Sequence, residues 1–395
     1  MYKDLSHLNE KDLNILIEKY YSENITVQEI LEEYKLDIQA SKLYTYFPPV
    51  VFKEYECIYC KSYMVANRHS KTYGNKYHTY DLYCPNCNHK YDDKFCNCEH
   101  CKQELLDKEI SKQEMIFEAY NTFAIDPILF EKLSFTNKIY LGAIVRALIS
   151  EDLDYIKELE LSNIKLSPYD NFDFDIYREL TKEKILLVSP FSNINAFEDS
   201  DKFPNVYYIS RVQYLINISK IDHSLEKTIE TIINPEYFTL DNVDEAYNLW
   251  IEIAINECIE YLMYRIAKVK FKFNPAKKTY SLFKLLLNNF SVSQIYNIIY
   301  RSVASASQDY LERGISKEHA ANCIIGACER YANKALMKGW NIEAYKRNYD
   351  LRQSEISEFF FNKVIKIGDL GFDIAPNIEL LKNKFNNNSD VNNFE

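Results

Sequence analysis

The sequence predicts a mainly α-helical protein with small β modules. Apolar residues recur at the three- and four-residue spacing of a helix over most of the chain, and the runs with strand character are few and short. Hydrophobic residues make up 47% and charged residues 27% of the 395 residues, as in folded proteins of about two or three domains. Seven of the ten cysteines lie between residues 57 and 101, which sets that segment apart from the rest.

Residues 1–48 are predicted to form a helix-turn-helix-like unit. Leucines and isoleucines repeat at helical spacing from Leu8 onward, and Thr26 with Glu29 has the pattern of a capping box that starts a second helix. A third helix is expected from Ile38 to Tyr46, ended by two prolines. Three short helices with a tight second turn fit a helix-turn-helix, although any three-helix bundle fits equally well.

The cysteine-rich segment carries the strongest chemical signal. Each C-x2-C pair places two thiolates in one tight turn, where both can bind a single ion at about 2.3 Å. Such pairs flanking a hairpin, here expected between Tyr63 and Tyr83, resemble a zinc ribbon, so residues 49–110 are predicted to form a zinc-ribbon-like module. The predicted metal ligands are Cys57, Cys60, Cys84, Cys87, Cys96, Cys98, Cys101 and His89.

The number of cysteines indicates one or two zinc ions. If the two C-x2-C pairs share one ion, the last three cysteines need a histidine, and the candidates are His89, His100 and His78. An interleaved pairing and an iron–sulfur cluster are alternatives. The frame also resembles the zinc frame around some HNH nuclease sites. However, the histidines between the pairs, His69 and His78, do not follow an acidic residue.

Residues 111–235 are predicted to form an α+β unit with the element order of a winged helix. A helix is expected to begin at Ser111, followed by helices over residues 137–150 and 173–184. Two β-rich runs, Ile185–Ser189 and Val206–Ile218, follow them. An ordinary α+β packing unit explains the same order.

Residues 236–382 are predicted to form a helical bundle with a basic segment. Helices are expected from Asp241 onward and near residues 280–289, 291–313, 316–339 and 353–366. Residues 383–395 are rich in asparagine and are predicted to be a disordered tail.

The net charge of −11 is unevenly distributed. No acidic residue occurs between Glu260 and Asp309, a stretch with eight basic residues, so the rest of the chain has a net charge of −19. Aromatic residues such as Phe271 and Phe283 are interleaved, a combination that suits a phosphate backbone with unstacked bases. The alternative is that the rings pack into the bundle. The predicted nucleic-acid-binding residues are Arg265, Lys268, Lys270, Lys272, Lys277, Lys278, Lys284 and Arg301.

Several function classes are disfavoured. The chain has only seven glycines and no G-x-G-x-x-G or P-loop motif, so no nucleotide cofactor is expected. Glu257 and Glu260 lie on one predicted helix, but no histidine accompanies them, and a surface charge or a buried pair with Arg265 explains them better. No catalytic motif was found, so an enzyme is not favoured. Without a long apolar run or a signal region, we expect a cytoplasmic protein with no membrane partner.

These features predict a zinc-containing nucleic-acid-binding protein without catalytic activity of its own, whose partner is the phosphate backbone of DNA or RNA. In architecture alone it resembles DNA-binding proteins of mobile elements and bacterial defence loci. One alternative is a protein–protein adaptor or sensor subunit that uses the zinc module and the acidic surface to bind a partner or a second copy. The other is a nuclease with a degenerate HNH-like zinc frame.

Overall fold

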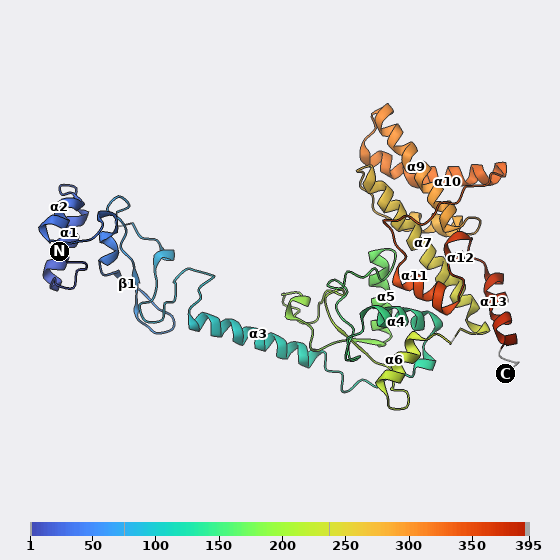
Figure 1. Cartoon of the computed structure of the whole chain (residues 1–395), viewed down its shortest axis with the longest axis horizontal. Coiled ribbons are helices and arrows are strands. Elements are labelled where there is room, and N and C mark those ends of the chain that lie inside the picture. Colours follow the sequence, from blue (N-terminus) through green and yellow to red (C-terminus); the bar gives the residue numbers. More distant parts are fainter. Residues whose placement is uncertain (1, 75, 237, 392–395) are drawn as a thin grey trace. The chain divides into compact units, whose positions relative to one another are not determined.

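The chain is mainly helical, with two small antiparallel sheets of two strands each (Figure 1). The computed structural model describes residues 2–74, 76–236 and 238–391, with side chains in the last helix described to residue 384. The chain divides into two compact units, Met1–Lys112 and Gln113–Glu395, which we call the N-terminal and C-terminal units.

The N-terminal unit begins with three short helical segments around their own core. Helix α1 spans Glu10–Tyr21, α2 spans Val27–Glu33, and the capping box between Thr26 and Glu29 is present as predicted. The predicted third α-helix is instead a 3-10 helix, η1, over Ala40–Tyr46. Prolines follow it at once, which leaves a segment too short for a stable α-helix. A helix-turn-helix would need an α-helix here, so the structure supports only a small helical unit.

The cysteine-rich module contains a β-hairpin, but not where the sequence predicted it. Strand β1 (Val50–Glu56) pairs antiparallel with β2 (Tyr63–Ala66), and the first C-x2-C pair lies in the turn between them. The segment from residue 67 to residue 78 has no strand among its described residues and leads to a 3-10 turn, η2 (Thr79–Asp81). The hairpin therefore forms around the first cysteine pair, and the pairing predicted between Tyr63 and Tyr83 is reduced to one antiparallel bridge, in which Val65 and Tyr83 exchange two backbone hydrogen bonds of 2.8 Å.

Helix α3 spans Glu99–Ala119, and the division between the two units falls within it. The sequence placed a helix start at Ser111, but that residue lies inside α3. The helix begins directly after Cys98, so the cysteine cluster, rather than the capping signal at Ser111, determines where it starts.

The middle region follows the predicted order of elements. Helices α4 (Phe135–Leu148) and α5 (Asp170–Lys182) precede strands β3 (Leu186–Val188) and β4 (Tyr214–Ile216), which pair antiparallel. Each strand has three residues, and residues 189–213 connect them, so the pair lacks the tight connection of a simple β-hairpin wing. Helix α6 (Leu225–Ile233) follows and packs on α4.

The last part of the chain is helical, as predicted. Its elements are α7 (Val243–Lys268), α8 (Lys277–Leu286), α9 (Val292–Arg313), α10 (Lys317–Lys338), α11 (Glu355–Glu358), the π-helical turn η6 (Phe359–Val364), α12 (Leu370–Asp373) and α13 (Ile378–Val391). Helix α13 continues to Val391 and so overlaps the segment that the sequence predicts to be a disordered tail from residue 383. Residues 392–395 lie outside the described residues.

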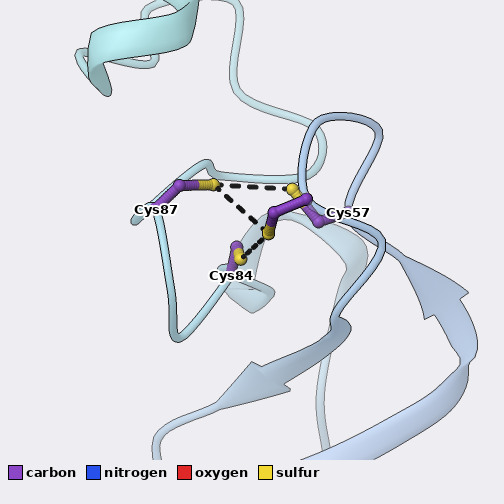
Figure 2. A group of neighbouring side chains, drawn as sticks. Cys57, Cys84 and Cys87 are labelled. Atoms are coloured by element: carbon purple, nitrogen blue, oxygen red, sulfur yellow. Dashed lines mark hydrogen bonds between the residues drawn. The ribbon is translucent and has the colours of Figure 1, made fainter.

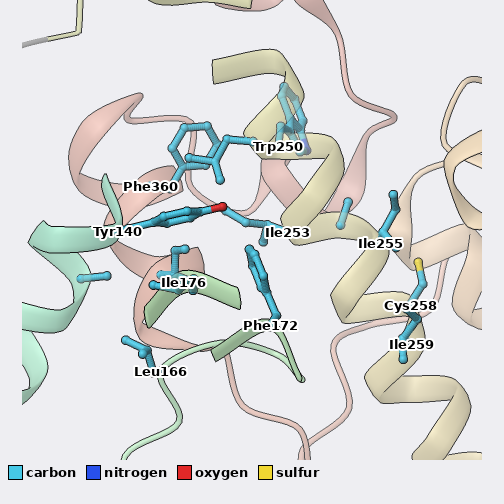
Figure 3. Packing of buried hydrophobic residues seen from close by; sticks show 14 of the residues in the cluster. Tyr140, Leu166, Phe172, Ile176, Trp250, Ile253, Ile255, Cys258, Ile259 and Phe360 are labelled. Atoms are coloured by element: carbon cyan, nitrogen blue, oxygen red, sulfur yellow. The ribbon is translucent and has the colours of Figure 1, made fainter. Parts of the chain in front are cut away.

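One hydrophobic core unites the whole C-terminal unit. It runs from Ile116 to Leu381 and includes the fully buried Trp250 of α7, whose Nε1 donates to the Gly371 oxygen at 2.9 Å. Figure 3 shows residues of this core around α7, among them Tyr140, Phe172 and Trp250. The domain boundary predicted at residue 235 falls within this one core, because α4 packs against α7 and α11.

One buried and one half-buried ion pair connect α7 to distant segments. The Glu257 carboxylate accepts from Arg347 at 2.9 Å and from the Ser357 hydroxyl at 3.0 Å, and its side chain is 1% exposed. Glu260 pairs with Lys165 at 2.5 Å. The predicted partner Arg265 instead lies over the Tyr300 ring, 4.4 Å from its centroid. Both carboxylates are therefore structural, since removal of either partner would leave a buried charge unpaired.

Gly142 provides a test of the packing between α4 and η6. A Cβ atom there would lie 2.3 Å from the Phe359 ring and 3.1 Å from the Ile232 oxygen. We expect Gly142→Ala to lower the free energy of unfolding by about 1–3 kcal/mol, measured by urea denaturation. The control is Gly326→Ala, where only the flexible end of Arg330 lies close, and where alanine should raise stability by up to about 1 kcal/mol. Equal effects at both positions would contradict this packing.

Asp173 gives the C-terminal unit a pH dependence. It is buried on α5, one carboxylate oxygen has no hydrogen-bond partner, and burial raises its pKa from 3.8 to about 7. The folded state thus holds the proton more tightly than the unfolded state, so stability falls as the pH rises from about 4 to about 7. We expect Asp173→Asn to remove this loss, which is on the order of 2–4 kcal/mol.

The measurement is the free energy of unfolding of both proteins across that pH range. The difference between them should grow with pH and level off above about 7. Asp175→Asn, which removes the same charge from an exposed position of α5, is the control. A difference between Asp173→Asn and the wild type that stays constant with pH would contradict the assignment.

Candidate functional site

The structure gathers the four cysteines of the two C-x2-C pairs into one group. The ligand atoms of Cys57, Cys60, Cys84 and Cys87 all lie within 4.8 Å of one another. Sulfur atoms are 3.5 Å apart between Cys57 and Cys87 and 3.1 Å apart between Cys60 and Cys84 (Figure 2). Four thiolates at about 2.3 Å from a tetrahedral ion would be about 3.8 Å apart, so the group has the right size for one metal ion.

The two cysteine turns have the same backbone geometry. In the first, Lys61 N donates to Cys57 O at 3.0 Å, and in the second, Asn88 N donates to Cys84 O at 2.9 Å. Lys61 and Asn88 each have a φ of 58°, the left-handed conformation that reverses the chain after the second cysteine. In both turns, backbone hydrogen bonds and backbone conformation therefore position the two cysteines.

The remaining three cysteines form a second group with His89. The Nδ1 atom of His89 lies 3.5 Å from the Cys96 sulfur, 3.8 Å from Cys98 and 3.4 Å from Cys101. The Cys96 sulfur also accepts from Lys90 N at 3.2 Å, and Cys101 lies in the first turn of α3. Three thiolates and one imidazole are a complete tetrahedral set.

Two residues connect the groups. The oxygen of His89 accepts from Cys84 N at 2.7 Å, inside the second cysteine turn, while its ring faces the second group. Tyr59, inside the first cysteine turn, has its hydroxyl 3.4 Å from the Cys101 sulfur and packs edge-on against the His89 ring. The backbone or side chain of a residue in one group therefore contacts the other group, so the two groups are structurally linked.

This arrangement decides between the ligand pairings that the sequence left open. The two C-x2-C pairs belong together, so the interleaved pairing is wrong. His89 completes the second group, whereas His100 stacks on Tyr59 and His78 stacks on Tyr80. The spacing alone could not choose among these histidines, because the choice depends on how the second turn is folded.

The predicted basic residues lie in the C-terminal unit in two environments. Lys270, Lys272, Lys277, Lys278 and Lys284 are exposed and have no carboxylate partner among the described residues. Arg265, Lys268 and Arg301 instead lie over aromatic rings, and Lys268 also pairs with Asp350 at 3.9 Å.

Most of the rings that the sequence paired with these lysines pack into the core, which is the alternative that the sequence left open, and in the described part of the chain Tyr264 alone among them lies beside a cation. Phe271 is 6% exposed and Phe283 is fully buried, so both belong to the core and cannot stack on a base. Phe273 and Tyr280 are half-buried and pack against the same core. The alternation of lysine and phenylalanine thus reflects the burial of one side of the chain.

Other rings lie beside the cations, on what we call the cation–aromatic surface. It is formed by Tyr264, Arg265, Lys268, Tyr300, Arg301, Tyr331, Lys334, Lys338, Trp340 and Tyr345. The ammonium groups of Lys334 and Lys338 lie 5.4 and 5.2 Å from the centre of the Trp340 ring, which is 43% exposed. Tyr300, 39% exposed, contacts both Arg265 and Tyr345. These contacts join α7, α9, α10 and the segment that follows α10.

The structure also brings together a histidine and an aspartate that are distant in the sequence. His69 Nε2 lies 3.8 Å from an Asp81 carboxylate oxygen, and both residues line a cavity in the N-terminal unit. In the sequence, the residue directly before His69 is Arg68 and not an acidic residue. The loop that brings residues 69 and 81 together gives no such local signal.

No protein-family model matches the chain, and no curated protein or solved structure matches it either. The functional assignment therefore depends on the geometry alone. In the part of the chain that the structure describes, no helix has the length and apolar character needed to cross a bilayer.

Metal content tests the two groups. We expect two ions per chain, measured by elemental analysis and native mass spectrometry, and one ion in His89→Ala because only the second group loses a ligand. His100→Ala is the matched control and should retain two ions, since that ring lies outside both groups. A single ion in the wild type, or loss of both ions in His89→Ala with the fold intact, would contradict the two-site arrangement.

Proposed function

We propose that the chain is a zinc-containing protein that binds single-stranded or unpaired nucleic acid through the cation–aromatic surface. The observation that carries this proposal is the series of Lys and Arg side chains held against partly exposed rings on α7, α9, α10 and the segment after α10. Its zinc ions would be structural.

Zinc is supported by the ligand sets. Four thiolates in one group and three thiolates with one imidazole in the other are the combinations typical of structural zinc. Both sets are complete, so neither leaves an open position for a reacting water or substrate. The buried cluster beside the first group contains only Cys57, Met64, Ala66, Leu82 and Cys84, which is too little apolar core to hold the module folded without metal.

Nucleic-acid binding is supported by the pairing of charge with rings. Cations neutralise phosphates, while exposed rings stack on bases that are not already stacked in a duplex. Tyr300 offers accessible ring surface next to Arg265, and Trp340 does so next to Lys334 and Lys338. Arg301 lies over the half-buried Tyr331 ring. Asp350 lies at the edge of this surface, where Lys268 and the Tyr264 hydroxyl contact it. Five exposed lysines between residues 270 and 284 add positive charge to the same unit.

The salt dependence of binding tests the proposed contacts between the cationic side chains and the phosphates. We expect the affinity for a labelled oligo(dT), measured by fluorescence polarisation, to fall steeply with salt. A plot of log K against log salt concentration should fall with a slope of about 0.7 per phosphate contacted. The triple variant Arg301→Gln, Lys334→Gln, Lys338→Gln should lower affinity at least about tenfold and reduce the slope by up to about 2. The control triple Lys157→Gln, Lys184→Gln, Lys202→Gln removes three exposed lysines elsewhere in the unit.

Ring stacking is tested on Trp340. In a Trp250→Phe background, which leaves Trp340 as the only tryptophan, oligo(dT) should quench the fluorescence. Trp340→Leu should weaken binding by about tenfold without changing the salt slope. Absence of salt-sensitive binding, or equal losses in the surface and control triples, would contradict the proposal. A complex with another protein that persists at high salt would favour the adaptor alternative.

A further inference from the structure

We propose that the cavity of the N-terminal unit beside His69 and Asp81 binds a guanine base. Tyr44, Thr45, Phe47, Asn67, Arg68, His69 and Asp81 line this cavity. Its volume is about 450 Å³, within the range of roughly 300–1,000 Å³ that small-molecule sites have. None of these residues belongs to the metal groups or to the cation–aromatic surface. The proposal goes beyond the proposed function because it adds a site that selects one base.

The cavity combines an aromatic side with a polar side. Tyr44 and Phe47 come from η1 and its end, and they contribute flat apolar surface. Asn67, Arg68 and Asp81 come from the chain that follows β2 and from η2, and they contribute hydrogen-bonding groups. A flat heteroaromatic ring with polar edges is the ligand that satisfies both sides.

The polar groups retain free hydrogen-bonding capacity. One Asp81 carboxylate oxygen accepts from His78 N at 2.9 Å, and the other has no hydrogen-bond partner among the described residues. Asn67 uses its oxygen to accept from Tyr83 at 2.8 Å, which leaves its NH₂ group free to donate. Arg68 donates through Nε to Pro48 O at 3.0 Å and also interacts with the Tyr21 hydroxyl, and its terminal amino groups have no carboxylate partner in the described part of the chain.

Guanine is the base that complements this set. Its Watson–Crick edge presents two neighbouring N–H donors, which suit a carboxylate such as Asp81. Its O6 and N7 acceptors suit an arginine, which is the commonest specific contact to guanine. Pyrimidines lack the O6 and N7 pair, and adenine has no pair of adjacent donors on the edge that would meet Asp81.

The surrounding contacts hold these groups in place before a ligand arrives. The His69 ring stacks on Tyr77 with centroids 4.9 Å apart, and its Nε2, buried and without a hydrogen bond, faces Asp81. Tyr21 donates to His69 O at 2.6 Å, and Lys71 Nζ donates to Ile25 O at 2.6 Å, so the helical segments and the loop of the cysteine module form one wall. His69 is therefore a positioning residue for Asp81.

The experiment uses the full chain with two kinds of probe. Isothermal titration with GMP, AMP, CMP and UMP measures the cavity alone, and fluorescence polarisation compares oligo(dT) with the same oligomer carrying one central guanine. We expect GMP to bind and the other three to bind at least about tenfold more weakly. The guanine-containing oligomer should bind more tightly than oligo(dT).

Asp81→Asn keeps an acceptor for His78 N but removes the charge, and it should abolish both the GMP preference and the gain from the central guanine. Asp92→Asn is the matched control, since Asp92 is exposed, accepts from Thr79 in the same module and does not line the cavity. Retention of the full metal content by both variants shows that the module is folded. His69→Gln should weaken GMP binding less than Asp81→Asn does.

The two proposals fail separately in this design. Oligo(dT) contains no guanine, so loss of oligo(dT) binding alone would count against the cation–aromatic surface and leave the cavity supported by GMP. Equal binding of all four mononucleotides, absence of GMP binding, or an unchanged preference in Asp81→Asn would overturn the guanine site.

Discussion

The linkage of two cysteine groups, each of which could hold a metal ion, is the constraint on which the N-terminal unit depends. The described part of the module around β1 and β2 has a small buried cluster, so its chain path depends more on the contacts at these groups than on apolar burial. His89 contributes its oxygen to one group and its ring to the other, and Tyr59 extends from the first turn to the second group. The position of the loop that carries Asn67, Arg68 and His69 depends in turn on this frame, because β2 leads directly into it.

In the C-terminal unit, the burial of apolar side chains determines the path of the chain. Its core needs no metal, and the chain after α10 is held by buried polar contacts instead: Arg347 pairs with Glu257, while Gln294 and Asn297 donate to the oxygens of Ile342 and Glu343. These contacts fix an irregular segment that carries Trp340 and Tyr345. A buried ion pair adds little net stability, but it is costly to break, which makes it suited to hold one conformation of such a segment.

The sequence predicted what depends on local spacing and missed what depends on the path of the chain. Both C-x2-C pairs, the capping box at Thr26 and most helices of the C-terminal unit follow from residues close together in the sequence. The choice of His89, the contact of Tyr300 with Arg265, and the approach of Asp81 to His69 involve segments joined only by folding. The lysines lie at the surface as expected. Phe271 and Phe283 pack into the core and do not lie beside the lysines as exposed rings, which is the alternative that the sequence left open.

The two units offer different kinds of side chains to a ligand. Closed metal groups cannot accept a substrate, so they leave binding to side chains that the frame holds. In the C-terminal unit the side chains that we propose for binding are cations beside rings, which suit phosphates and stacked bases rather than one sequence. In the N-terminal unit the side chains around the cavity include a carboxylate, an arginine and an amide, whose directional hydrogen bonds suit the edge of one base. The net charge of −11 does not argue against the proposed binding, because exposed lysines and rings beside cations are local features that the average charge conceals.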